Sequence, residues 1–196
     1  MRIMETPVYK FAELSPEAKE KAIESFRHIN VEDNDWYVFT FEGWYELLES
    51  YGFIAPEIYF SGFWSQGDGA CFDARIDIKR AFKEYVTEQL LAHNPVKHKK
   101  WIFDYIDNYC SVSIKKINYH YSHENTRRID YSLDDYPHIN KSAENFFQWL
   151  ENKRCALCCE IYNALEKDYN YLTSDEAVIE TIEANDYEFT SGGKLV

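Results

Sequence analysis

The chain has 196 residues, of which 45% are hydrophobic and 17% aromatic, and a formal net charge of -13. This composition excludes a wholly disordered chain, and the length is sufficient for a packed core. The acidic balance argues against a protein that grips nucleic acid over a broad basic face, and no apolar run approaches the ~20 residues of a membrane-spanning helix. We therefore expect no direct nucleic-acid binding and no membrane insertion; the acidic surface serves solubility or binds a basic partner.

Helical spacing of apolar residues predicts six helices in chain order. The first begins cleanly, because Ser15 can cap it and Pro16 suits its first turn. Gly52 is a natural stop for the second, and Thr173 with Glu176 forms a capping box for the last. A short apolar entry at residues 8–11 and a short strand near the C-terminus complete the pattern. The expected helices cover residues 16–29, 35–50, 78–92, 101–109, 141–169 and 175–184.

Two β-hairpins are predicted between these helices. In residues 56–76, Ile58, Phe60, Phe72, Ala74 and Ile76 alternate as strands require, and three of the seven glycines fall within eight residues. Glycine supplies the positive dihedrals of a tight connection, so these residues form the hairpin's tip. The second hairpin pairs residues 113–121 with 126–133. The prediction is one α+β domain over residues 1–196: a small antiparallel sheet built from hairpins, packed by about six helices.

The tip of the first hairpin is the main candidate site. The tip carries Trp64, Ser65, Gln66 and Asp68. Trp64 can stack on a base, Gln66 or Asp68 can hydrogen-bond its edge or a ribose hydroxyl, and the glycine amides can face an anion. The structural alternative is an ordinary hairpin whose Asp-Gly pair supplies turn chemistry. The motif is neither a P-loop nor a nucleophile elbow, because the residues that define those motifs are absent.

Cationic groups for an anionic ligand come from Arg75 on the second strand and from Arg127. Residues 115–128 form a locally basic, tyrosine-rich segment on an acidic chain, which suits a binding wall. His120, His123 and Glu124 lie at its expected tip, where a general-base histidine or a plain polar loop are both compatible with the sequence.

Five cysteines, three of them at positions 155, 158 and 159 of one expected helix, do not make a disulfide framework. The first residues also have no signal-peptide core, so we expect a reducing, cytoplasmic location. Zinc ligands favour knuckle-like loops and paired Cys-x-x-Cys motifs, and only one such motif exists. We therefore expect buried thiols, with no metal and no cofactor.

Three segments carry a resemblance to known proteins: residues 8–22 (VYKFAELSPEAKEKA), 59–72 (YFSGFWSQGDGACF) and 184–196 (ANDYEFTSGGKLV). The chain resembles a family of small, uncharacterised accessory proteins of bacteriophages and prophages that carry a YFSGFWSQGDGA-type motif. The resemblance implies a role against host defences, inside the host cell. It assigns no catalytic residue.

These observations together predict a phage accessory protein that binds without catalysis and sequesters a small anionic, nucleotide-derived immune signal of the host. The expected ligand-binding residues are Trp64, Ser65, Gln66, Asp68, Arg75 and Arg127. One alternative is an acidic inhibitor or nucleic-acid mimic that occupies a host defence protein. Another is a nucleotide hydrolase that uses Asp68 or His120. A homodimer is compatible with the many aromatic residues.

Overall fold

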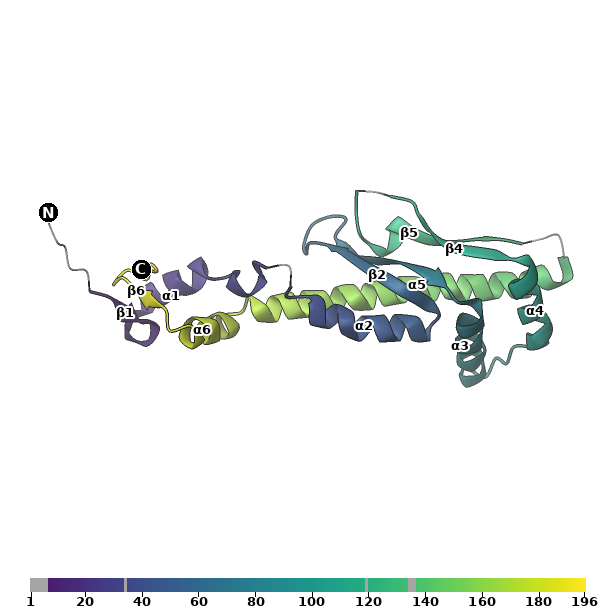
Figure 1. Ribbon diagram of the computed structural model, residues 1–196, viewed down its shortest axis with the longest axis horizontal. Coiled ribbons are helices and arrows are strands. Elements are labelled where there is room, and N and C mark those ends of the chain that lie inside the picture. Colours follow the sequence, from purple (N-terminus) through teal and green to yellow (C-terminus); the bar gives the residue numbers. More distant parts are fainter. Residues whose placement is uncertain (1–6, 34, 119, 134–136) are drawn as a thin grey trace. The chain divides into compact units, whose positions relative to one another are not determined.

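The computed structural model describes residues 7–33, 35–118, 120–133 and 137–196. These residues form six α-helices and three two-stranded antiparallel sheets, which confirms the predicted α+β class (Figure 1). The chain divides into two compact units: unit 1 contains Met1–Val38 and Leu165–Val196, and unit 2 contains Phe39–Ala164. The helices are α1 (Pro16–Ser25), α2 (Val38–Ser50), α3 (Ile78–Leu91), α4 (Lys99–Tyr109), α5 (Pro137–Leu172) and α6 (Asp175–Ala184).

Unit 1 joins the two ends of the described chain. Strand β1 (Tyr9–Lys10) pairs with β6 (Glu188–Phe189), so that Tyr9 lies opposite Phe189. Phe189 is fully buried and packs edge-on against Phe11. The predicted cap of α1 is confirmed, because Ser15 accepts a hydrogen bond from the amide of Ala18. The core of unit 1 contains Phe11, Leu14, Ala18, Ala22, Ile23, Val178, Ile182 and Phe189.

The cap of α6 differs from the predicted one. Ser174, not Thr173, accepts the capping hydrogen bond, from the amide of Ala177 (3.3 Å). Thr173 instead donates its hydroxyl hydrogen bond to the carbonyl of Tyr169, because α5 continues to Leu172. The predicted capping box was therefore one residue out of register with the real helix start.

In unit 2, the first hairpin is confirmed. Strand β2 (Phe53–Ser61) pairs with β3 (Gly69–Ile76), and Ser61 lies opposite Gly69. The register shifts between Ile54 and Glu57, where Ala55 has a φ of 49°. The inward positions Phe53 and Phe72 pack edge-on, with ring centroids 4.9 Å apart. The hairpin therefore ends in the glycine tip as predicted, but burial does not alternate along β3, where Gly69, Ala70, Cys71 and Phe72 are all buried.

The second hairpin is shorter than predicted. Strand β4 (Ser111–Lys116) pairs with β5 (Arg127–Ser132), so the first strand ends five residues before Tyr121. Tyr119, another predicted strand residue, lies outside the described residues. The connection carries a 3-10 turn at Glu124–Thr126. The amides of Ile117 and Asn118 both donate to the carbonyl of Thr126, which closes the ladder and frees the residues between them for a loop.

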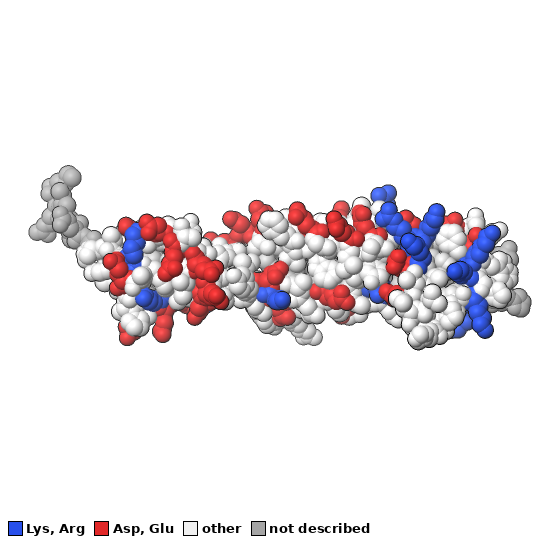
Figure 2. Space-filling model, turned by 90° about the horizontal axis from the view of Figure 1, so that it is seen from below, with Lys and Arg blue, Asp and Glu red and all other residues white. Residues whose placement is uncertain are grey.

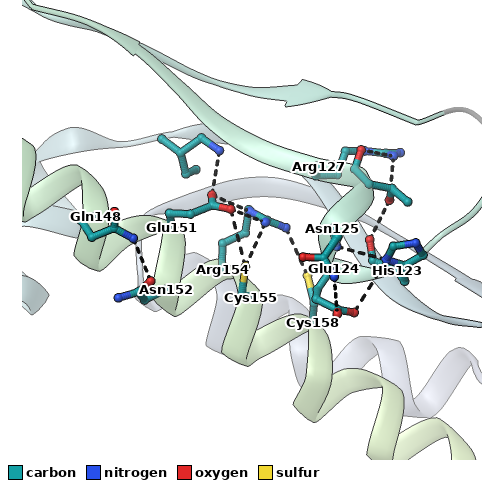
Figure 3. Close-up of polar contacts among 12 residues, drawn as sticks. His123, Glu124, Asn125, Arg127, Gln148, Glu151, Asn152, Arg154, Cys155 and Cys158 are labelled. Atoms are coloured by element: carbon teal, nitrogen blue, oxygen red, sulfur yellow. Dashed lines mark hydrogen bonds and ion pairs between the residues drawn. The ribbon is translucent and has the colours of Figure 1, made fainter. Parts of the chain in front are cut away.

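Helix α5 runs along both hairpins of unit 2 (Figure 1). Its Arg154 is fully buried and donates two hydrogen bonds to the Glu151 carboxylate (3.0 and 2.6 Å). The same carboxylate accepts from the amide of Ile129 on β5 (2.7 Å) and from the Cys155 thiol (3.5 Å) (Figure 3). Burial favours the neutral form of Glu151. The hydrogen bonds from Arg154 and Ile129 outweigh burial and lower the pKa of Glu151. This carboxylate thus ties the helix to the outer edge of the second hairpin.

A candidate ligand-binding site at the glycine tip

The tip of the β2–β3 hairpin is shaped by its glycines and by Asp68. Gly62 and Gly67 have φ values of 38° and 92°, which side chains rarely adopt. The Asp68 carboxylate accepts a hydrogen bond from the amide of Ser65 (2.6 Å) and lies 3.2 Å from the position that a Cβ of Gly62 would take. Asp68 therefore folds back into the tip and holds its turn.

The connection between β4 and β5 packs directly on Gly67 and Gly69. A Cβ on Gly67 would lie 2.8 Å from the Tyr121 ring, and a Cβ on Gly69 would lie 2.4 Å from the Cβ of His123. Only hydrogen atoms fit at such separations. Glycine at positions 67 and 69 thus allows two segments that are far apart in the sequence to come into contact. The absence of a side chain matters here for packing as well as for the backbone conformation of the turn.

Hydrogen bonds within the second loop fix the side chains that face the tip. The amide of Asn125 donates to Nδ1 of His123 (3.2 Å), and the Thr126 hydroxyl donates to the His123 carbonyl (2.7 Å). The Asn125 side-chain amide donates to Glu124 (2.7 Å), as Figure 3 shows. His123 Nδ1 acts as an acceptor here, so any proton of the neutral ring lies on Nε2.

A cavity of about 570 Å³, open to solvent, lies between the two loops. Its wall offers carboxylate, amide and imidazole groups beside one aromatic ring, which is a set suited to hydroxyl and amino groups of a ligand. None of the described residues that line it is Lys or Arg. The lining residues are Gln66, Gly67, Asp68, Asn118, Tyr121, His123, Glu124 and Asn125. We call this cavity the tip pocket.

Four of the six expected site residues lie at the tip. Gln66 and Asp68 line the tip pocket. Ser65 contributes its amide to the turn, and Trp64 has a φ of 72° while its side chain is 70% exposed. A bulky residue at positive φ is strained, and such strain clusters at functional positions.

The two expected arginines are placed differently. Arg127 is 2% exposed and its guanidinium donates to both oxygens of Asp73 (2.6 and 3.2 Å), with the Tyr59 ring 5.6 Å away. Arg75 is exposed and lies opposite Ile54, at the far end of the hairpin from the tip. Arg127 therefore braces the two hairpins, and neither arginine is among the residues that line the tip pocket.

The expected basic wall of residues 115–128 is also partly neutralised. Arg127 faces inward to Asp73, and Arg128 pairs with Asp130 (3.3 Å). The sequence analysis did not assign Asn118 or Tyr121 to the site, because it extended the first strand through Tyr121, and it placed Asn125 in the connection without a ligand-binding role. The Gly-Asp-Gly spacing was the available signal: small residues at 67 and 69 indicate close approach by another segment.

Cys155 and Cys158 lie on α5 in surroundings that favour the protonated thiol. Burial raises the pKa of Cys155 to about 11 and that of Cys158 to about 12, and the Arg154 guanidinium only partly offsets it. None of the five cysteines forms a disulfide bond. Among the described residues, no group of three or more His, Cys, Asp or Glu side chains could hold a metal ion. None of the helices described there is long and apolar enough to cross a membrane.

Residues 36–175 match the family model described as a domain of unknown function (DUF8835). The chain belongs to the DUF8835 family. The matched region contains the whole of unit 2, and thus both loops of the tip pocket. No curated protein and no solved structure matches the chain.

Proposed function

We propose that this DUF8835 protein is a binding protein that holds a small nucleoside-containing molecule in the tip pocket without altering it. The observation that supports this proposal is the pocket itself. Two loops from separate hairpins meet at Gly67 and Gly69 and border an open cavity of about 570 Å³ that is lined by hydrogen-bonding side chains. Pockets of some 300–1,000 Å³ with a few convergent polar groups are typical of small-molecule sites.

The lining favours the sugar and base of such a ligand over a phosphate. Carboxylates at Asp68 and Glu124 accept from hydroxyl and amino groups, while amides at Gln66, Asn118 and Asn125 provide both donors and acceptors. The same two carboxylates repel an anion, and no Lys or Arg is among the described lining residues to offset them. In this proposal, any phosphate of the ligand therefore points out of the pocket.

Binding is favoured over catalysis because the reactive groups already have structural tasks. Asp68 accepts the Ser65 amide and keeps the turn, and His123 Nδ1 accepts the Asn125 amide. Glu124 is held by the Asn125 side chain. These hydrogen bonds fix the loops, and in this proposal the remaining lone pairs of the two carboxylates accept hydrogen bonds from the ligand without taking a proton from it.

The cellular role that we propose is sequestration of a host immune signal. It is supported by the resemblance of residues 59–72, which contain the tip, to phage accessory proteins. A protein that retains a nucleotide-derived signal without turnover needs a pocket large enough for that molecule, and it needs no set of catalytic residues. The tip pocket meets the first requirement.

Calorimetric titration of the full chain with adenosine, guanosine, cytidine, uridine and their 5′-monophosphates tests the binding proposal. We expect at least one nucleoside to bind and its monophosphate to bind no more tightly, because the acidic lining gains nothing from a phosphate. Gln66→Ala removes one hydrogen-bonding group and should weaken binding about threefold to tenfold.

Gln148→Ala is the matched control for this titration. Gln148 is exposed on α5, donates to Asn152 one turn away, and is not among the described lining residues of the tip pocket. Its replacement should leave the affinity unchanged. Failure of every probe to bind, or an equal loss in both glutamine variants, would contradict the proposal.

A further inference from the structure

A second concave surface lies between α3 and α4 and shares no lining residue with the tip pocket. Two hollows of about 590 and 490 Å³ have four lining residues in common, Val86, Leu90, Lys99 and Lys100, and therefore form one continuous groove. Phe82, Val86 and Leu90 follow one another at four-residue spacing on α3. We call this surface the α3–α4 groove.

The groove has a firm base. The Phe82 ring packs against Phe103 of α4 and Phe146 of α5, with ring centroids 5.6 and 5.3 Å apart. On the opposite face of α3, Glu88 accepts from the Trp149 indole (2.8 Å) and pairs with Lys153 (2.8 Å). Because α3 is attached on its inner face, the groove is a formed surface that a partner can meet without rearrangement.

The groove combines exposed apolar side chains with positive charge. Leu90 is 62% exposed and Trp101, on its rim, 63%. Lys83, Lys99 and Lys100 line it, with Asp104 as the acidic lining residue among those described. Figure 2 shows Lys and Arg gathered at the end of unit 2 where Figure 1 places α3 and α4, although the chain carries a net charge of -13.

Helix stability does not explain these lysines. Lys99 and Lys100 occupy the first turn of α4, where the helix dipole is positive and a cation is unfavourable by some 0.3–1 kcal/mol. Exposed leucine and tryptophan beside them likewise gain nothing from solvent. Both features are favourable only when an apolar and acidic surface covers them.

We propose that the α3–α4 groove is a docking site for an acidic amphipathic helix of a partner protein. Residues 82 to 90 of α3 span roughly 12 Å, or about two helical turns, which matches apolar anchors spaced i, i+4 and i+7 on a bound helix. Glutamate or aspartate beside those anchors meets the three lysines of the rim. The concave form favours an inserted helix over a flat lipid surface.

Fluorescence anisotropy with two labelled helical peptides tests this proposal on the full chain. Both peptides carry leucines at i, i+4 and i+7; one has glutamates beside them and the other lysines. We expect the glutamate peptide to bind and the lysine peptide not to bind. Leu90→Ser should weaken binding about tenfold or more, because most of a leucine contact is lost.

The chain offers matched controls for both features. Leu91 is 74% exposed and does not line the groove, so Leu91→Ser should leave the affinity unchanged. The pair Lys99→Glu and Lys100→Glu should abolish binding, whereas Lys79→Glu outside the groove should not. Both leucines are exposed, so each variant should fold, which circular dichroism checks.

Three outcomes would overturn the docking proposal. The first is that the glutamate peptide does not bind. The second is that Leu90→Ser and Leu91→Ser weaken it equally. The third is that the protein binds vesicles containing phosphatidylserine and Leu91→Ser reduces that binding as much as Leu90→Ser, since a membrane would contact both exposed leucines.

Discussion

Gly69 shows at the scale of one residue how the tip pocket depends on close packing. Its φ is not in the left-handed region, so another side chain is excluded by space alone. A Cβ there would meet both the Cβ and the Cα of His123, at 2.4 and 2.8 Å. Because one of these atoms belongs to the backbone, the second loop must move to make room.

We predict that Gly69→Ala lowers the free energy of unfolding by about 1–3 kcal/mol and lowers the affinity of the tip pocket for its ligand. Gly43→Ala is the matched control. Gly43 lies inside α2 with no atom within 4 Å of its added Cβ, so alanine there should stabilise by about 0.5–1 kcal/mol. Urea denaturation of both variants checks the prediction, and equal effects would refute it.

The ionisation of Glu151 makes the stability of the fold depend on pH. Its side chain is 27% exposed, and its pKa is lowered from the ordinary value of 4.5 in spite of burial. A group with a lowered folded pKa contributes stability above its unfolded pKa. That contribution is lost as the pH falls through the folded value.

We predict that Glu151→Gln lowers the free energy of unfolding by about 3 kcal/mol at neutral pH, because Arg154 is left as an uncompensated buried charge. The difference from wild type should shrink as the pH falls below the ordinary pKa of 4.5, because the unfolded chain then binds a proton before the folded protein does, and it should vanish once the pH has passed through the lowered pKa of folded Glu151. Denaturation curves between neutral and acidic pH measure it, with Glu160→Gln on the exposed face of α5 as the control. A difference independent of pH would show that ionisation of Glu151 is not involved.

At the scale of elements, unit 1 depends on the pairing of β1 with β6. Gly193, with a φ of 80°, lies in the turn after β6, and a Cβ there would lie 2.2 Å from the carbonyl oxygen of Ala18. This contact joins two of the three segments that carry the family resemblance, residues 8–22 and 184–196. The close approach of α1 to the C-terminal turn explains why glycine is required at this position.

Gly193→Ala should therefore lower the melting temperature, through both the steric conflict and the positive φ. The neighbouring Gly192→Ala should have little effect, since its added Cβ would meet only the Thr190 hydroxyl, at 4.0 Å. Differential scanning calorimetry compares the two variants. A larger loss for Gly192→Ala would contradict the packing of this turn.

Sequence periodicity predicted the helices and strands that bury one face. It gave the wrong strand end where tertiary contacts determine how far the strand extends. The β2–β3 hairpin was predictable because its alternation and its glycines agree. The alternation of Ile117 and Tyr121 also resembles a strand. However, the ladder closes at Thr126, and the packing of Tyr121 on Gly67 competes with strand extension. Such competition between segments distant in the sequence is invisible in a local pattern.

The candidate site was predictable only in part for the same reason. Gln66 and Asp68 were identified from the chemistry of the tip, and both line the tip pocket. The inward turn of Arg127 to Asp73 joins residues of two different hairpins that lie 54 positions apart in the chain. No spacing rule indicates that an arginine in a basic segment is a buried brace.

At the scale of the molecule, the net charge of -13 implies self-repulsion in the folded state. The α3–α4 groove is a basic exception within this acidic chain. The alternative of an acidic inhibitor or nucleic-acid mimic also depends on this charge and stays a prediction. It requires affinity for a basic partner that falls steeply with added salt.

We predict that raising the ionic strength from about 0.01 to about 0.15 M raises the melting temperature, because the Debye length falls from ~30 to ~8 Å and like charges are screened. Sodium chloride titration followed by circular dichroism measures this. A falling melting temperature would mean that attractive ion pairs dominate the surface.

The most direct test of the central claim is mass spectrometry of small molecules released by heat from the purified full chain. The account predicts a nucleoside-containing molecule in near-stoichiometric amount from the wild-type protein and from Gln148→Ala. It predicts depletion of that molecule from Gln66→Ala and Gly69→Ala. Recovery of no such molecule from cells that contain nucleotide signals, or equal recovery from all variants, would contradict the assignment of the tip pocket.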